Sequence, residues 1–402
     1  MSCSSPINSK SSLIEAYEHW EPKVNAWECY HPDRIDHTCL NVGIKDVINT
    51  ADCPTEMGSP TWKGHTPGND ARVVTKLKEA GCVIAGKTGS AEFAVHHPGG
   101  TRNPHDLSRT PGTSSSGSAV AVACGMVDAA LGTQTGGSII RPASWCGVYA
   151  MKPSFGLIPR TGILKTSDTL DTVGFFARIP ELLSLMLDIC RVDGPDYPYT
   201  AQLKKRRNIK KIGVAYPPCW NAWPDYAQEA LEDWLSRLNE FFNAEEAPWD
   251  LEACYETHRR IYHKSLSYYF QKEVETGTVS DIFRSQVEEG RQISAQRYQD
   301  DLKIQESLSF VADKLLKSYD ILITLSSGGE APEDERTAPK DTCLVWTMTG
   351  VPVINIPMFR SPDGLPFGLS IIARRYHDYK LLGFLEVLVK SGLAPIAPNP
   401  KL

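Results

Sequence analysis

The sequence lacks the patterns that mark several common functional classes. Its 11 cysteines are scattered without a CxxC pair or Cys/His ligand spacing, so they predict reduced thiols in a cytosolic protein and neither a disulfide framework nor a zinc site. No window approaches the roughly 18 apolar residues of a membrane span, and residues 1–10 do not resemble a signal peptide. The net charge of −6 gives no footprint for nucleic acid or a membrane surface.

The glycine-rich region at 109–153 also lacks phosphate-binding motifs, and the pair His96–His97 lacks metal-ligand spacing. The patterns GxxxxGK[ST] and GxGxxG do not occur in the glycine-rich region, and GxSxG does not surround Ser138. The pair His96–His97 has no acidic or cysteine ligand at a metal-like interval, so we expect no metal site. The basic run at 204–211 follows a polar segment and precedes a strand-like stretch at 212–215, which favours a solvated linker over a binding patch.

The N-terminal half alternates between helical and strand patterns. Apolar residues at helical spacing predict helices, and short apolar runs predict buried strands. Asn69 or Asp70 is the expected cap of the second helix, and Gly81 is expected to end it. This alternation is typical of an α/β sheet covered by helices, with helices expected at 11–26 and 70–80 and strands at 40–44 and 82–85.

The middle of the chain changes character. From about 179 to 320 longer helical patterns dominate, and we interpret this span as a helical insert on the substrate side. Strand-like runs return at 321–325, 351–356 and 369–372, which we expect to complete the same sheet. The prediction is therefore a single large α/β/α domain over residues 1–402, with a central mixed twisted sheet covered by helices.

A glycine–serine region at 109–153 carries the strongest chemical signal. A serine-rich turn ending at Ser118 leads into a run of small residues suited to close helix packing. Further along, Gly136 and Gly137 precede Ser138, and adjacent glycines allow the backbone to approach a substrate oxygen closely. Backbone N–H groups in such a loop can stabilise an oxyanion. Either serine run by itself is more often structural.

A serine nucleophile needs a base, and the sequence suggests Lys45. Lys45 ends an apolar run, and burial would lower its pKa toward the working range of a base. The alternative is a surface lysine paired with Asp46, which is the better interpretation for an isolated lysine.

Taken together, these blocks resemble the amidase signature family. The resemblance is dense over 40–175 and 318–372 and weak between. It rests on the blocks Gly43–Asp46, Gly86–Ala94, Pro111–Ser118, Gly132–Pro142, Cys146–Ser154, Trp346–Pro357 and Asp363–Leu369.

The resemblance implies a Ser-cisSer-Lys triad and an amidase acting on linear amides. Ser138 would be the nucleophile, Ser114 the bridging serine on a cis peptide and Lys45 the base, with the oxyanion bound by N–H groups of Thr135, Gly136, Gly137 and Ser138. No metal or organic cofactor is required. Homodimers are common among such relatives, and the sequence leaves the oligomeric state open.

Three departures from the family pattern concern the substrate. Gln134 stands where an Asp is common, and we expect a structural role there. Arg141 lies three residues after Ser138, as in the malonamidase-like GTQTGGSxIRPA subgroup, where the shifted arginine pairs with a substrate carboxylate. The alternative is that Arg141 braces the loop through Glu92 or main-chain carbonyls. The candidate substrate-binding residues are Arg141, Thr113 and Gln134.

The third departure is a short region before Lys45, which argues against a large surface for a tRNA-transamidase partner. We therefore expect hydrolysis of a small-molecule carboxamide, without nucleic acid or membrane partners. The alternative is an amide or acyl transferase, or a component of a complex, that uses the same fold and triad. Hydrolysis and transfer share the acyl-enzyme and differ in whether water or an amine captures it.

Overall fold

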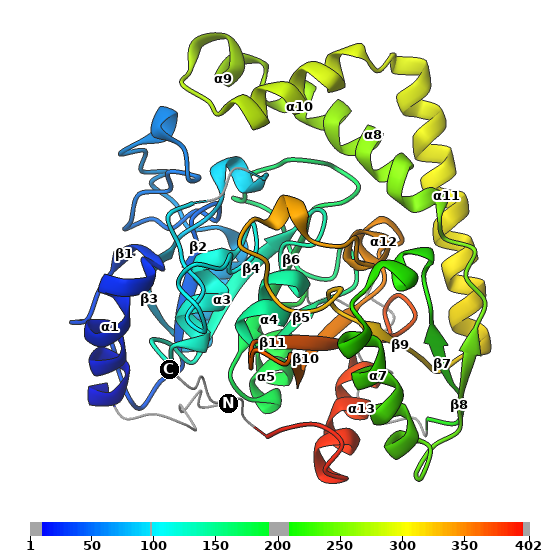
Figure 1. Ribbon diagram of the computed structural model, residues 1–402. Helices are drawn as coiled ribbons and strands as arrows, with labels where there is room; N and C mark the ends of the chain where they lie inside the picture. The colour runs from blue at the N-terminus through cyan, green and yellow to red at the C-terminus, as the bar shows by residue number, and fades with distance from the viewer. Residues whose placement is uncertain (1–9, 97–98, 193–208, 397–402) are drawn as a thin grey trace.

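The computed structural model describes residues 10–96, 99–192 and 209–396. Within these ranges one mixed sheet of 11 strands crosses the molecule in the order β1-β3-β2-β4-β6-β5-β10-β11-β9-β7-β8 (Figure 1). The strands are β1 (Trp27–Tyr30), β2 (Asn41–Lys45), β3 (Val83–Thr88), β4 (Ala129–Gln134), β5 (Tyr149–Lys152), β6 (Thr172–Ala177), β7 (Ile212–Ala215), β8 (Ala244–Ala247), β9 (Ile321–Leu325), β10 (Val353–Arg360) and β11 (Pro366–Ile372).

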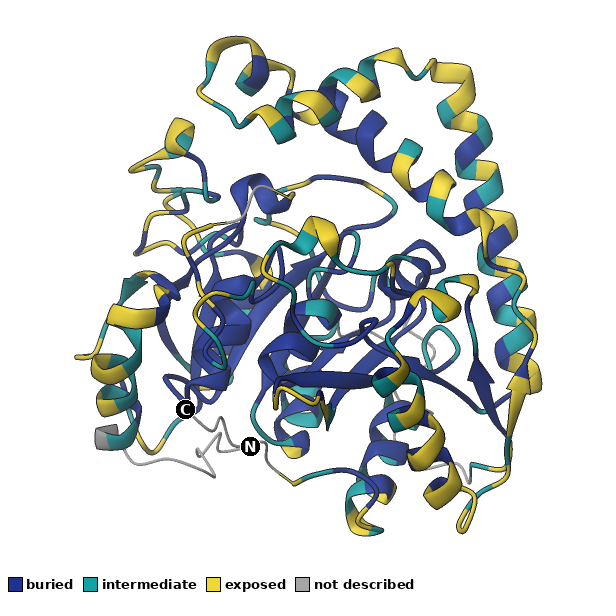
Figure 2. Cartoon of the chain, in the orientation of Figure 1, coloured by how far each residue is buried: buried dark blue, intermediate teal, exposed yellow. Residues whose placement is uncertain are grey.

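The sheet mixes parallel and antiparallel pairs. β2 runs parallel to both β3 and β4, and β7 runs parallel to both β8 and β9. The remaining pairs are antiparallel. Most of the sheet lies in the core of the molecule (Figure 2). The strands that are buried at every residue are β2, β4, β5, β6, β7, β9 and β11. The predicted α/β class with a central mixed sheet is confirmed.

Helices cover this sheet in layers. α3 and α4 contact each other and the middle strands, while α5 contacts α2, α13 and the strands β5 and β6. Among the described helices, none is long and apolar enough to cross a membrane. The helices are α1 (Lys10–Val24), α2 (Arg72–Glu79), α3 (Ser116–Ala123), α4 (Ile140–Cys146), α5 (Pro180–Cys190), α7 (Asp225–Leu238), α8 (Ala253–Tyr269), α9 (Gln271–Thr276), α10 (Asp281–Gln292), α11 (Ala295–Ser318), α12 (Cys343–Met348) and α13 (Asp378–Lys390).

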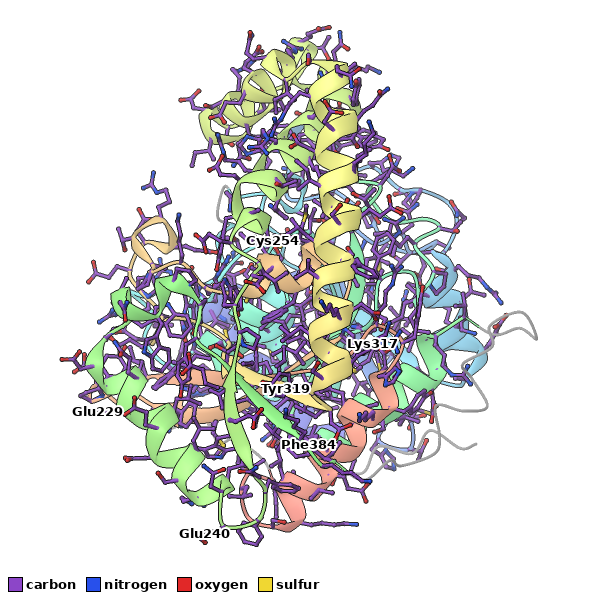
Figure 3. All side chains as sticks on the ribbon, turned by 90° about the vertical axis from the view of Figure 1, so that its right-hand side faces the viewer. Glu229, Glu240, Cys254, Lys317, Tyr319 and Phe384 are labelled. Carbon is purple, nitrogen blue, oxygen red and sulfur yellow. The ribbon has the colours of Figure 1, made fainter. Side chains whose placement is uncertain are left out.

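The span 179–320 does more than form a helical insert. Its strands β7 and β8 extend the sheet beside β9, because β7 pairs in parallel with both β8 and β9. The helices α8 to α11 then form a lobe above the sheet, in which α8 packs against α10, α11 and α12 (Figure 1). Figure 3 shows α11 descending from this lobe to Lys317 and on to Tyr319, which leads into β9.

One predicted helix boundary is wrong. α2 is capped by the backbone of Ala71, and neither Asn69 nor Asp70 caps it. Asp70 instead accepts the N–H of Ala51 and pairs with Lys78. Its carboxylate is therefore used to tie the helix to a neighbouring turn. Gly81 follows the helix with a φ of +82°, in line with the predicted stop. His97 and residues 204–207 of the basic run lie outside the described ranges.

Candidate active site

Lys45 lies fully buried at the end of β2, between β3 and β4. Its Nζ donates to Ser114 Oγ at 2.7 Å and to Thr133 Oγ1 at 2.9 Å. Burial lowers the pKa of Lys45 well below its usual value, and the negative charge of Asp171 offsets only part of this effect. Burial thus favours the neutral amine, which is the form that can accept a proton, so the environment of Lys45 suits a general base.

The alternative interpretation of Lys45, a surface pair with Asp46, is wrong. Asp46 is itself buried and its Oδ1 lies 3.1 Å from Lys87 Nζ. Lys87 also donates to the carbonyl of Pro54 and to Thr55 Oγ1. The lysines of the neighbouring strands β2 and β3 therefore have different partners, and Lys45 is the one that reaches the serine-rich turn.

Ser114 lies in the turn before α3, and the Thr113–Ser114 peptide bond is cis, as the family resemblance implied. The N–H of Thr113 donates to Glu335 Oε2 at 2.7 Å, which anchors the turn to a loop distant in the sequence. Gly112 adopts a φ of +89°, and a Cβ there would come within 3.0 Å of α4. Only glycine fits this close approach without strain.

The loop 135–138 joins β4 to α4. Ser138 and Gly136 are partly exposed, and the Ser138 hydroxyl has no hydrogen-bond partner among the described residues. The described part of the chain also offers no acceptor to the backbone N–H groups of Gly136, Gly137 and Ser138. A Cβ on Gly137 would lie 2.7 Å from the guanidinium of Arg141, so glycine permits the close packing of this loop. Free N–H groups in a compact loop can bind an oxyanion.

Gln134 holds the end of this loop, where it leads into α4. Its Oε1 accepts the N–H groups of Ile139 at 2.8 Å and Ile140 at 3.0 Å. Its Nε2 donates to Thr347 Oγ1 at 2.9 Å, and Thr347 donates in turn to the carbonyl of Gly136 at 2.7 Å. Gln134 is fully buried and its amide is already bonded at both ends. These contacts favour the structural role over a substrate contact.

Asp171 holds the start of the loop through Thr135. No motif in the sequence indicated this carboxylate. It accepts hydrogen bonds from the hydroxyls of Thr135 at 2.7 Å and Thr166 at 2.6 Å, and from the N–H groups of Thr166 and Ser167. Burial raises the pKa of Asp171, and these hydrogen bonds counteract the rise. Asp171 immediately precedes β6, whose first residue pairs with Gln134. The only sequence signal for Asp171 was a polar residue directly before an apolar stretch.

Arg141 lies among carboxylates of its own chain. Its Nε donates to Asp341 at 2.7 Å and its Nη1 donates to Glu335 at 2.9 Å. Burial alone would lower the pKa of Arg141, but the charges of Asp341 and Glu335 keep it well above its usual value. The suggestion that Glu92 braces Arg141 is wrong, because Glu92 accepts hydrogen bonds from Ser280 instead. Two ion pairs favour bracing over recognition of a substrate carboxylate.

The helical lobe contributes one histidine to the loop. His258 on α8 donates from Nε2 to the carbonyl of Thr135 at 2.7 Å. Burial lowers the pKa of His258 to about 4, so the ring is neutral at pH 7. No motif in the sequence pointed to this residue.

A neighbouring cavity of about 300 Å³ is lined by Thr133, Thr135 and Asp171 together with the 160–166 loop, and neither Ser114 nor Ser138 is in its lining.

The chain is similar to several known proteins. The chain is 30% identical to a glutamyl-tRNA(Gln) amidotransferase subunit from Koribacter versatilis, over 89% of this chain and 85% of that protein. Its structure is similar to one described as crystal structure of amidase, with a TM-score of 0.83 and 25% identity over 94% of both chains. It also resembles native peptide amidase from Stenotrophomonas maltophilia in fold, with a TM-score of 0.81 and 23% identity over 98% of this chain and 96% of that one.

A family model named Amidase matches residues 39–382. This span contains each of the three predicted triad positions, together with the strands β2 and β4 beside which they lie. The chain therefore belongs to the amidase family of amide-hydrolysing enzymes.

Proposed function

We propose that this protein hydrolyses a carboxamide bond of a small molecule through an acyl-enzyme on Ser138. The observation that carries the proposal is the buried Lys45, whose Nζ lies 2.7 Å from Ser114 Oγ and whose pKa is lowered by burial. This contact supplies the step of the relay between Ser114 and Lys45, and the step from Ser138 to Ser114 is part of the proposal.

The reaction begins when neutral Lys45 takes a proton from Ser114, which takes the proton of Ser138. The Ser138 oxygen bonds to the amide carbon, and the carbonyl oxygen becomes an oxyanion. When the carbon–nitrogen bond breaks, the proton returns from Lys45 through Ser114 to the leaving nitrogen. Water then attacks the acyl-enzyme by the same relay, which releases the carboxylate product and restores the Ser138 hydroxyl.

The oxyanion would be bound by backbone N–H groups of the loop 135–138. The N–H groups of Ile139 and Ile140 are occupied by Gln134, so they are not available. The N–H groups of Gly136, Gly137 and Ser138 have no acceptor within the described residues, which supports them as donors. Donors fixed before the charge develops stabilise the transition state more than donors that must reorganise.

A second candidate is an amide transferase that works in a complex. It is favoured by the relatives that are glutamyl-tRNA(Gln) amidotransferase subunits, since this chain covers 85%, 82% and 92% of the length of three of them. The same triad serves hydrolysis and acyl transfer, because both pass through the acyl-enzyme and differ in whether water or an amine captures it. The malonamidase-like substrate class, a cytoplasmic location and a homodimer stay predictions.

Ammonia release from a panel of malonamate-like, aryl and aliphatic amides tests the proposal. We expect turnover of at least one amide by the chain alone and none by Ser138→Ala. Absence of turnover on every amide, or full activity of Ser138→Ala, contradicts it. Repeating the assay with and without an added amine acceptor separates the two candidates, since turnover only with the acceptor supports transfer.

A further inference from the structure

Two cysteines and a histidine converge outside the proposed catalytic site. Cys29 lies on the edge strand β1, His31 follows that strand, and Cys53 lies in the turn after β2. His31 Nε2 lies 3.2 Å from Cys29 Sγ and 3.1 Å from Cys53 Sγ, and the three atoms all lie within 4.8 Å of one another. Cys53 is buried while the other two are half-buried, so the cluster is anchored inside and reachable from solvent.

The spacing of these atoms is close to a tetrahedral zinc site. Zinc bonds of about 2.3 Å to thiolate and about 2.0–2.1 Å to imidazole, at tetrahedral angles, place nitrogen and sulfur about 3.6 Å apart. The two nitrogen–sulfur distances are a few tenths of an ångström shorter than this value. Because Cys29 and His31 are half-buried, a small outward shift of their side chains would accommodate the ion.

Two carboxylates near the cluster, Asp46 and Asp52, are already paired. Lys87 forms an ion pair with Asp46 at 3.1 Å, and Arg34 forms one with Asp52. Neither carboxylate is therefore a free ligand. Two thiolates would balance the charge of a zinc ion, and a neutral imidazole would complete three protein ligands. The fourth position would be open to water or another small ligand.

We propose that Cys29, His31 and Cys53 form a zinc site that ties the edge strand β1 to the loop after β2. The loop is also held by Lys87, which donates to the carbonyl of Pro54 at 3.1 Å and to Thr55 Oγ1 at 2.6 Å. A metal bond at Cys53 adds a link from this loop to an edge strand that pairs only with β3 in the described sheet. The sequence pattern predicted no zinc site, because Cys53 follows His31 by 22 positions and only strand pairing brings them together.

Metal titration of the full chain tests this site. The protein is reduced, treated with a chelator and titrated with Co²⁺, which gives a thiolate-to-cobalt charge-transfer band when cysteines bind it. We expect one ion per chain, displacement of cobalt by zinc, and a rise of a few degrees in melting temperature with saturating zinc. Cys29→Ser and Cys53→Ser should each lose the band and the rise in melting temperature.

Two variants provide matched controls. Cys39→Ser and Cys219→Ser change half-buried cysteines outside the cluster and should keep both signals. Circular dichroism of each variant establishes that it is folded. Absence of a charge-transfer band in the unaltered protein overturns the proposal, as does a band that persists in both Cys29→Ser and Cys53→Ser. A disulfide between Cys29 and Cys53 in the purified protein, without metal uptake after reduction, overturns it as well.

Discussion

The hydrogen bonds of Gln134 allow a quantitative test of how the loop before α4 is held. Gln134→Met keeps nearly the same volume but removes the acceptor for the N–H groups of Ile139 and Ile140 and the donor to Thr347. Gln134 is fully buried, so water does not readily replace the lost acceptor. The substitution therefore isolates the hydrogen bonds from the effect of a cavity.

The expected loss of stability follows from the two N–H groups. A buried donor left without an acceptor costs about 1–3 kcal/mol, so two donors give about 2–6 kcal/mol. Relaxation of the loop and burial of the methionine side chain offset part of this cost, and we expect a loss of about 2–4 kcal/mol in the free energy of unfolding. The loop would also lose its fixed position, and we expect kcat/KM to fall about 10–100-fold.

Urea denaturation and ammonia release measure the two effects. Gln134→Glu is the matched control, because its carboxylate keeps an acceptor for both N–H groups and should retain more activity than Gln134→Met. An unfolding free energy for Gln134→Met within about 0.5 kcal/mol of the unaltered protein, with kcat/KM within about twofold, would refute the bracing role of Gln134.

Three further predictions concern the charged groups of the site. Lys45→Met should reduce amide turnover on the order of 10⁴-fold because it removes the base. It should not lower stability in urea, because the amine that it removes is desolvated in the fold. Substantial turnover in this variant would exclude Lys45 as the base. The negative charge of Asp171 raises the pKa of Lys45, and the base works when neutral. Asp171→Asn should therefore shift the acidic limb of the kcat/KM profile to lower pH. A shift to higher pH would contradict this reasoning. Arg141→Ala leaves the buried Asp341 without its cation and should lower the unfolding free energy by about 3–5 kcal/mol. It should reduce turnover of carboxylated and neutral amides equally, and a selective loss on carboxylated amides would instead favour substrate recognition.

Much of the local structure follows from short stretches of sequence. The apolar run before Lys45 predicted a strand that ends on a buried lysine, and β2 ends at that residue. The serine-rich turn before small residues predicted the start of a close-packed helix, and α3 begins at Ser116. Both predictions are correct because the pattern of apolar, small and polar residues next to one another in the sequence favours a strand at β2 and a helix start at α3.

Partners of buried polar groups were less predictable. Glu92 and main-chain carbonyls were the suggested bracing partners of Arg141 if it did not bind a substrate carboxylate, yet the arginine pairs with residues 194 and 200 positions away. Asp171 and His258 contact the loop 135–138 through Thr135, and neither belongs to a motif. The strand-like stretch Ile212–Ala215 was predicted and forms β7, but β8 was not predicted, and the pairing of β7 with both β8 and β9 is seen only in the structure.

The sequence by itself was enough to predict the family and the α/β class, and it supplied the three proposed triad positions, because each depends on local patterns at family-like spacing. Only the tertiary structure decided how those positions are supported. It placed Asp171 and Gln134 at the two ends of one loop, paired Arg141 with the chain's own carboxylates, and brought Cys29 and Cys53 to one histidine. Hydrogen bonds and ion pairs act over a few ångströms, and strands and helices distant in the sequence must pack before those distances exist.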